Sequence, residues 1–353
     1  HILDDSTDET VGITRRKVEE YKAKDFQIEQ IIRPVRKGFK AGALKEGTVY
    51  AKGEFLAIFD AASDDYQGEQ CVDGNNQWLL PGFIDCHTHL VYGGNRANEF
   101  EQRLQGNTYS EIAQQGGGIL GTVNATRAAS METLLKDALK RAARLAEEGV
   151  TCIEVKSGYG LDKVTELKML KVAKQISEHL PVTIATTYLG AHTVPIEYTN
   201  DPDAYVQFVC EQVIPVVAEQ QLASSVDVFC ESIGFSPIQC RKIFEAAKHH
   251  NLTIKAHVEQ LSDLKGAKLA AEFAALSVDH IEYLDNQDIP ALKDAGSVAV
   301  LLPGAFYYLN ETQKPPVAAL RAAQVPMAIA TDLNPGSSPV ASLLTVMNMA
   351  SVL

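Results

Sequence analysis

The sequence predicts an α/β protein built on a (β/α)8 TIM barrel, and three observations support this fold class. Between residues 77 and 353, a short apolar segment followed by an amphipathic one occurs eight times. The apolar segments are rich in β-branched residues on both faces, as parallel strands covered by helices are. Polar residues stand at the ends of most of these segments, whereas an open doubly wound sheet would gather them at one switch point.

The same alternation places each element in order along the chain. The eight expected strands are 77–91, 150–158, 182–192, 224–235, 252–260, 275–284, 297–306 and 325–336. The eight helices expected after them are 131–149, 163–180, 203–221, 236–251, 264–274, 286–296, 315–323 and 338–350. The first helix pattern, 131–149, ends at a glycine, which is a common residue at helix ends.

The segment before the barrel does not follow this rhythm. Residues 1–40 predict one or two short charged helices, ended by Pro34, and receive no further assignment. Residues 41–76 contain short strand-like segments broken by Gly and Asn, which predict part of a small β-domain. We therefore expect three parts: an unassigned segment 1–40, a partial small β-domain 41–76 and the barrel 77–353.

The composition excludes several classes of function. The chain is 46% hydrophobic and 22% charged, which is ordinary for a globular protein, and its net charge of −13 disfavours nucleic-acid binding. Its six cysteines include no CxxC pair, so we expect a reducing, cytoplasmic compartment. The sequence has no signal-peptide pattern and no run of 18 apolar residues, so we expect no membrane span.

The stretch PGFIDCHTHLVYGGNR, residues 81–96, indicates a metal site. His87 and His89 are two residues apart at the end of an expected strand, so their side chains should point to the same side. In a barrel, chemistry takes place at the carboxyl ends of the strands. A single histidine there is as often a satisfied core residue as a ligand, but five at one rim favour a shared site. The further polar residues expected at this rim are His192, His257, His280 and Asp332.

Three imidazoles and one carboxylate suit a catalytic zinc ion, and iron could bind there as well. We predict the ligands to be His87, His89, His257 and Asp332. A metal bound in this way activates water for hydrolysis. We expect Asp332 to accept the proton of that water and His280 to orient the water or Asp332.

The glycine-rich stretch QQGGGILGT, residues 114–122, does not predict a phosphate-binding loop. It lacks the GK[ST] ending and follows no strand of its own. We expect a flexible loop over the site at this position.

Several motifs in order resemble the amidohydrolase superfamily, and within it the imidazolonepropionase family. They include HxH on the first strand, YLGAHTVP, KAHVEQLS, SVDHIEYL and ATDLNPGSSP, and the resemblance runs from residue 77 to the end. It implies hydrolytic ring opening of 4-imidazolone-5-propanoate to N-formimidoyl-L-glutamate in histidine degradation. It also implies one zinc or iron ion per subunit, a small-molecule substrate and a possible homodimer.

The resemblance implies a role for each residue that matches a family motif. Arg96 would grip the propanoate as a bidentate partner, with Tyr109 near the carboxylate. Tyr159, His192 and Gln260 would contact the imidazolone. The residues that would line the glutamate part of the product are Asn334, Gly336 and Ser337. Because Gln260 cannot titrate, we assign catalysis to Asp332, His280 and His192.

Two departures from the family leave other functions open. Residues 1–40 do not resemble the family's start, and the chain stops one helix after the eighth strand, so we expect the C-terminal part of the small β-domain to be absent. The alternatives are a related deaminase of a small heterocycle and a catalytically impaired, truncated homologue. Arg96 favours a carboxylated substrate, and the full ligand set argues against a barrel without catalysis.

Overall fold

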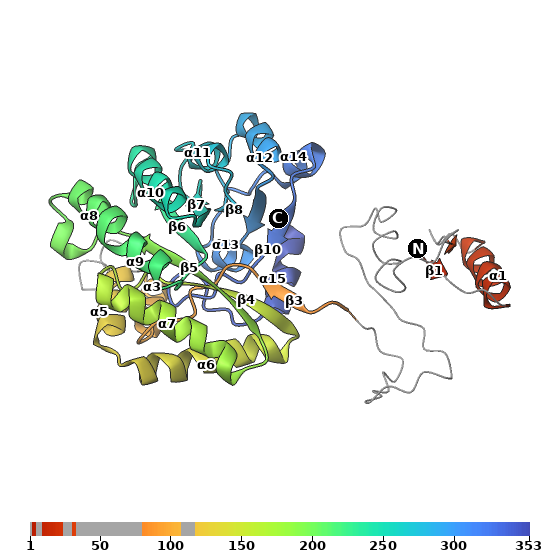
Figure 1. The fold of residues 1–353 in the computed structure, drawn as a ribbon, viewed down its shortest axis with the longest axis horizontal. Helices are drawn as coiled ribbons and strands as arrows, with labels where there is room; N and C mark the ends of the chain where they lie inside the picture. Colours follow the sequence, from red (N-terminus) through yellow and green to blue (C-terminus); the bar gives the residue numbers. More distant parts are fainter. Residues whose placement is uncertain (1, 5–8, 24–29, 33–79, 107–116) are drawn as a thin grey trace. The chain divides into compact units, whose positions relative to one another are not determined.

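The computed structural model describes residues 2–4, 9–23, 30–32, 80–106 and 117–353 (Figure 1). The chain forms two compact units, His1–Pro81 and Gly82–Leu353. In the first, the parallel strands β1 (Ile2–Asp4) and β2 (Gln30–Ile32) are joined through helix α1 (Thr10–Lys22). The β2 strand lies where the sequence suggested only helices. The small β-domain predicted over 41–76 lies outside the described residues.

The second unit is the predicted (β/α)8 barrel. Its eight parallel strands lie side by side in the order β10-β9-β8-β7-β6-β5-β4-β3. They are β3 (Phe83–Asp85), β4 (Val150–Lys156), β5 (Thr183–Ala191), β6 (Ser225–Cys230), β7 (Thr253–Val258), β8 (Ser277–His280), β9 (Val298–Leu301) and β10 (Met327–Ile329).

The first and last strands meet just beyond their ends and close the barrel. Thr88 forms a parallel bridge with Leu333, and the His89 amide donates to the Leu333 carbonyl at 3.0 Å. Asp85 adds a side-chain link, because its carboxylate accepts from both the amide and the hydroxyl of Thr331. The strand ends that carry the predicted site residues therefore face one common rim.

Helices surround the strands, as Figure 1 shows. Those after the first six strands are α3 (Ala97–Leu104), α5 (Ile119–Ala128), α6 (Met131–Glu147), α7 (Lys163–His179), α8 (Pro202–Phe208), α9 (Ile214–Glu219), α10 (Pro237–His249), α11 (Gly266–Glu272) and α12 (Ile289–Ala295). A π-helical turn, Val209–Val213, joins α8 to α9. The last two strands are followed by α13 (Pro303–Tyr308), α14 (Val317–Ala323) and α15 (Leu343–Met349).

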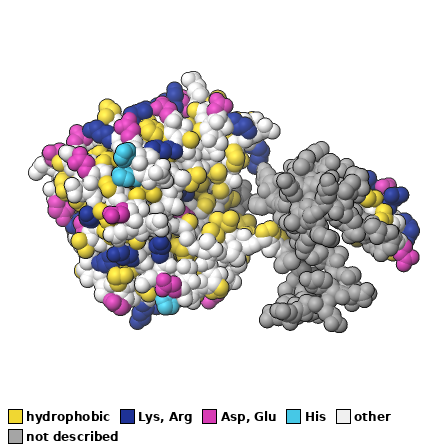
Figure 2. All heavy atoms as spheres, viewed as in Figure 1, with side chains coloured by type: hydrophobic (Ala, Val, Ile, Leu, Met, Phe, Trp, Pro, Cys, Tyr) yellow, Lys and Arg dark blue, Asp and Glu magenta, His cyan; other side chains and the backbone are white. Residues whose placement is uncertain are grey.

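Local sequence explains these helices well. Ser130 caps α6 by accepting from the Thr133 amide, and Ser236 and Gln239 form a capping box at α10. One face of α6 is buried at helical spacing, through Leu134, Ala138, Ala142 and Leu145. None of the described helices has the length and apolar character needed to cross a bilayer. Figure 2 shows acidic and basic side chains interspersed over the visible face of the barrel unit.

Three local expectations were wrong. In the described part of the strand predicted over 77–91, only Phe83–Asp85 is a regular strand, and beyond it Thr88 makes an isolated bridge to Leu333. The strand predicted over 297–306 ends at Leu301, because Pro303 begins α13. In the stretch 114–122, expected to be a loop, residues from Ile119 onward begin helix α5.

Candidate metal centre

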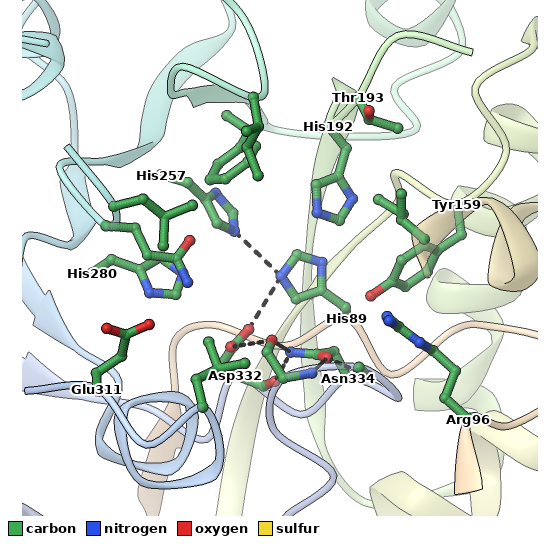
Figure 3. Close-up of a pocket in the computed structure, with 18 of the residues that line it drawn as sticks. His89, Arg96, Tyr159, His192, Thr193, His257, His280, Glu311, Asp332 and Asn334 are labelled. Atoms are coloured by element: carbon green, nitrogen blue, oxygen red, sulfur yellow. Dashed lines mark hydrogen bonds and ion pairs between the residues drawn. The ribbon is translucent and has the colours of Figure 1, made fainter. Parts of the chain in front are cut away.

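Four side chains from the first, fifth and eighth strand regions of the barrel converge at the rim. His87 and His89 follow β3, His257 lies on β7 and Asp332 follows β10, and all four are at most 3% exposed. The Nε2 atom of His89 lies 3.2 Å from Nε2 of His87 and 3.3 Å from Nε2 of His257. Oδ1 of Asp332 lies 3.4 Å from His89 Nε2 and 3.5 Å from His87 Nε2. Figure 3 shows His89, His257 and Asp332 pointing toward one another.

These distances fit a small cation. A tetrahedral ion with ligands at about 2.0–2.1 Å places its ligand atoms about 3.3–3.4 Å apart. Four of the six distances between these atoms, at 3.2–3.5 Å, are close to this value. Three neutral imidazole nitrogens that face one another also repel through their lone pairs, and a cation between them removes this repulsion. The donor set of three nitrogens and one oxygen therefore suits zinc or iron.

Two buried carboxylates hold two of these imidazoles from behind. His87 Nδ1 lies 2.6 Å from Oδ2 of Asp279, and His257 Nδ1 lies 3.0 Å from Oδ1 of Asp227. A carboxylate in this position keeps the proton on Nδ1, so that Nε2 carries the free lone pair. Burial also lowers the pKa of His87 and His89, which favours the neutral form that binds metal.

His280 faces the same point from β8. Its ring centroid lies 5.4 Å from that of His257 and 5.8 Å from that of His87. One ligand atom each of His87, His89 and Asp332 forms a group within 4.8 Å, and one nitrogen each of His280, His87 and His257 forms another such group. Among the described residues, His280 Nδ1 is buried without a hydrogen-bond partner. His280 is therefore close enough to act on anything held by the other four side chains.

The backbone is strained at three of these strand ends. Glu259, His280 and Asp332 have φ values of +48°, +79° and +52°, in the left-handed region that non-glycine residues rarely adopt. Each such residue costs about 1–3 kcal/mol. Strain of this kind is typical of sites at which side-chain direction matters more than local stability.

A cavity of about 510 Å³ opens next to this cluster, large enough for a small ligand. The ring of His192 is stacked on that of His89, with centroids 5.2 Å apart and planes 19° from parallel, and Tyr159 lies beside His192. The predicted substrate residues on its wall are Arg96, Tyr159, His192, Gln260, Asn334, Gly336 and Ser337. Tyr109 lies outside the described residues.

Glu99 holds one edge of the Arg96 guanidinium. Nε and Nη2 of Arg96 lie 2.8 Å and 2.7 Å from Oε2 of Glu99, whose Oε1 accepts from the Gly118 amide at 2.9 Å. The edge formed by Nη1 and Nη2 is thus the one left for a second carboxylate. Nη1 also lies so close to Gly336 that a side chain there would collide with it. Glu99 was not among the predicted site residues, although it lies three residues after Arg96, in the first turn of α3, at a spacing that allows the two side chains to pair.

Asn334 organises the turn that carries Asp332. Its Oδ1 accepts from the amides of Gly336 and Ser337, both at 2.7 Å, and its Nδ2 donates to the Asp332 carbonyl at 2.7 Å. Most of the hydrogen-bonding capacity of Asn334 is therefore used within the turn. The hydroxyl of Ser337 lies 3.4 Å from Oδ2 of Asp332, which helps to keep that carboxylate in place.

Glu259 and Gln260, the two residues that follow Val258 at the end of β7, point in different directions. Gln260 lines the cavity, whereas Glu259 accepts from the amides of Gly266 and Ala267 at the start of α11. Burial raises the pKa of Glu259 to about 7. Glu259 is therefore a residue of the fold behind the site, and Gln260 is the one that faces it.

Comparison with known proteins agrees with this geometry. The family model described as "Amidohydrolase family" matches residues 78–350. The imidazolonepropionase of Pseudoalteromonas atlantica is 68% identical over 281 residues, which cover 80% of this chain and 69% of the relative. That of Alteromonas mediterranea is 67% identical over 324 residues, covering 88% of this chain and 77% of the relative.

The chain belongs to the amidohydrolase family, among the imidazolonepropionases. As an amidohydrolase it is a hydrolase enzyme of a metal-dependent family. Solved structures with the same fold include a 5-methylcytosine deaminase from Klebsiella pneumoniae, with a TM-score of 0.59 at 15% identity over 85% of this chain and 76% of that one. A guanine deaminase from C. acetobutylicum has a TM-score of 0.56 at 15% identity, over 84% and 71%. At 15% identity, these two structures support only the assignment of the fold.

Proposed function

We propose that this amidohydrolase opens the ring of 4-imidazolone-5-propanoate with water and releases N-formimidoyl-L-glutamate, a step of histidine degradation. The observation that carries this function is the identity of 67–68% to curated imidazolonepropionases over most of the chain. The cavity supports it, because it combines a cluster of metal-ligand type with a guanidinium that suits a carboxylated substrate.

We assign one zinc or iron ion to His87, His89, His257 and Asp332. When bound, the metal supplies a Lewis acid and a water activated near neutral pH. The side chains behind these residues prepare them for that role. Asp279 and Asp227 direct the lone pairs of His87 and His257, and the turn around Asn334 fixes the position of Asp332.

Arg96 would bind the propanoate carboxylate through its Nη1–Nη2 edge, since Glu99 already occupies the other edge. This places the imidazolone ring toward His192, Tyr159 and Gln260. Its flat ring would lie against the aromatic side chains, and Gln260 would hydrogen-bond to it without exchanging a proton. Gly336 and Ser337 would line the glutamate part of the product.

Ring opening requires one proton to move. Water adds its oxygen to the ring carbonyl carbon, the bond from that carbon to the ring nitrogen breaks, and the proton lost by water must reach the leaving nitrogen. We assign this transfer to Asp332, with His280 fixing its geometry and His192 as a further catalytic residue beside the ring. Asp332 suits this role because Ser337 and the Asn334 turn hold its carboxylate at the cluster.

A related deaminase is not favoured, because the closely similar relatives are imidazolonepropionases and the deaminase likenesses reach only 15% identity. The homodimer and the cytoplasmic location are part of this proposal; the first rests on the family and the second on the cysteine pattern of the sequence.

The test follows the absorbance of freshly prepared imidazolonepropionate with the purified protein. We expect the absorbance to fall, chelator treatment to abolish the change, and added zinc or iron to restore it. A parallel incubation with an aminated heterocycle measures ammonia, which a deaminase would release. Metal-loaded protein that leaves the substrate intact would refute the proposed activity.

A further inference from the structure

A network of buried charges lies within the barrel behind the proposed metal site. At its centre is Lys156, the last residue of β4, whose side chain is fully buried. Its Nζ lies 2.7 Å from Oδ2 of Asp227 and 2.8 Å from Oε1 of Glu154. It also lies 3.8 Å from Oδ2 of Asp279. These carboxylates come from β6, β4 and β8, so one ammonium links three strands of the barrel.

Two of these carboxylates are the ones that orient the imidazoles. The two carboxylate oxygens of Asp227 have different partners: Oδ1 lies 3.0 Å from Nδ1 of His257, and Oδ2 contacts Nζ of Lys156. Asp279 Oδ2 faces Nδ1 of His87 at 2.6 Å. Lys156 is therefore linked to two of the four proposed ligands, His257 and His87, through one carboxylate each.

A charged group in this position has a clear physical effect. A buried carboxylate without a cation nearby is strongly penalised, and it takes up a proton or turns toward another donor. Burial alone would lower the pKa of Lys156, but the charges of Asp227, Glu154 and Asp279 outweigh burial and raise it. The lysine therefore stays an ammonium, and its contacts at 2.7 Å and 2.8 Å hold Asp227 and Glu154 in place.

We propose that Lys156 is a positioning residue of the metal centre: its ammonium holds Asp227 and Asp279 in the places from which they direct His257 and His87 at the ion. This inference rests on the proposed metal site. The two arms are unequal, because the contact with Asp227 is a direct hydrogen bond, whereas Asp279 is 3.8 Å away and has Lys255 at the same distance. The larger effect is therefore expected through Asp227 and His257.

The first test measures metal affinity by competition with a chelator in the Lys156→Met variant of the full chain. Loss of a group that orients metal ligands typically costs about 10–100-fold in affinity, and we expect a loss in this range. The matched control is Lys168→Met. Lys168 donates to the carbonyls of Thr126, Arg127 and Ala129 and touches none of the network's carboxylates. It should lower the unfolding temperature and leave metal affinity unchanged.

A second test separates positioning from general stability and does not depend on the folding of Lys156→Met. The double variant Lys156→Met with Asp227→Asn removes both charges of the hydrogen-bonded pair at once. If Lys156 acts mainly through Asp227, the double variant should bind metal within about twofold of Asp227→Asn alone. A further tenfold loss in the double variant would overturn the assignment of the larger effect to the Asp227 arm, and wild-type affinity in folded Lys156→Met would overturn the inference as a whole. Wild-type protein that binds no stoichiometric metal would instead refute the proposed metal centre.

Discussion

The substitution Arg96→Lys tests how the amidohydrolase would recognise a carboxylated substrate. Arg96 has two usable edges, and the structure shows one of them engaged with Glu99 through Nε and Nη2, at 2.8 Å and 2.7 Å. A lysine offers one compact ammonium and cannot serve Glu99 and a substrate carboxylate with two bonds each. The variant therefore loses contacts to the substrate while the net charge of the site is unchanged.

The size of the effect follows from the bonds lost. Hydrogen bonds to charged groups contribute about 1.5–3 kcal/mol, which corresponds to a roughly ten- to hundredfold loss of kcat/KM. Because the carboxylate is remote from the bond that breaks, most of this loss should appear as a higher KM. The assay is initial-rate absorbance loss with imidazolonepropionate over a range of concentrations.

Two comparisons make the result decisive. Arg144→Lys, on the exposed face of α6 where Arg144 pairs with Glu147, should leave both constants unchanged. Glu99→Gln keeps one acceptor for Arg96 and should raise KM less than Arg96→Lys does. Unchanged KM and kcat in Arg96→Lys would show that another group holds the carboxylate.

Four further substitutions probe the site. His257→Ala removes an imidazole from the cluster and should prevent stoichiometric metal binding, measured by elemental analysis; full occupancy would contradict the ligand assignment. Asp332→Asn keeps the shape of the side chain but removes the base, so kcat should fall by about 10²–10⁴-fold, and His280→Asn should cost less if its role is orientation. A reversed order at equal metal content would exchange the two roles. Gly336→Ala should displace the Arg96 guanidinium and raise KM by about tenfold, the equivalent of one hydrogen bond. An unchanged KM would contradict the contact of Arg96 with the substrate beside Gly336.

Local periodicity predicted most of the fold, because most strands and helices here have their own apolar pattern and several helices have a side-chain cap. The wrong predictions lie where contacts between distant segments of the chain determine the local structure. In the described part of the strand expected over 77–91, only Phe83–Asp85 is a regular strand; the residues beyond it make an isolated bridge at Thr88 to Leu333, which no local sequence signal predicts. Helix α5 was missed because the glycines before Ile119 suggested a loop, whereas Val123 and Thr126 are buried on the helix face.

Within the site, the sequence by itself determined which residue types stand at the strand ends and that His87 and His89 point the same way, since spacing along an extended chain sets both. It did not reveal which carboxylate stands behind each histidine. Asp279 is 192 residues from His87, and Asp227 is 30 residues from His257. The register of parallel strands in the closed barrel decides those pairings, and with them the place of Lys156 between the two carboxylates. Interior contacts of this kind arise only when the strands close on one another, because each side chain meets partners that local sequence does not contain.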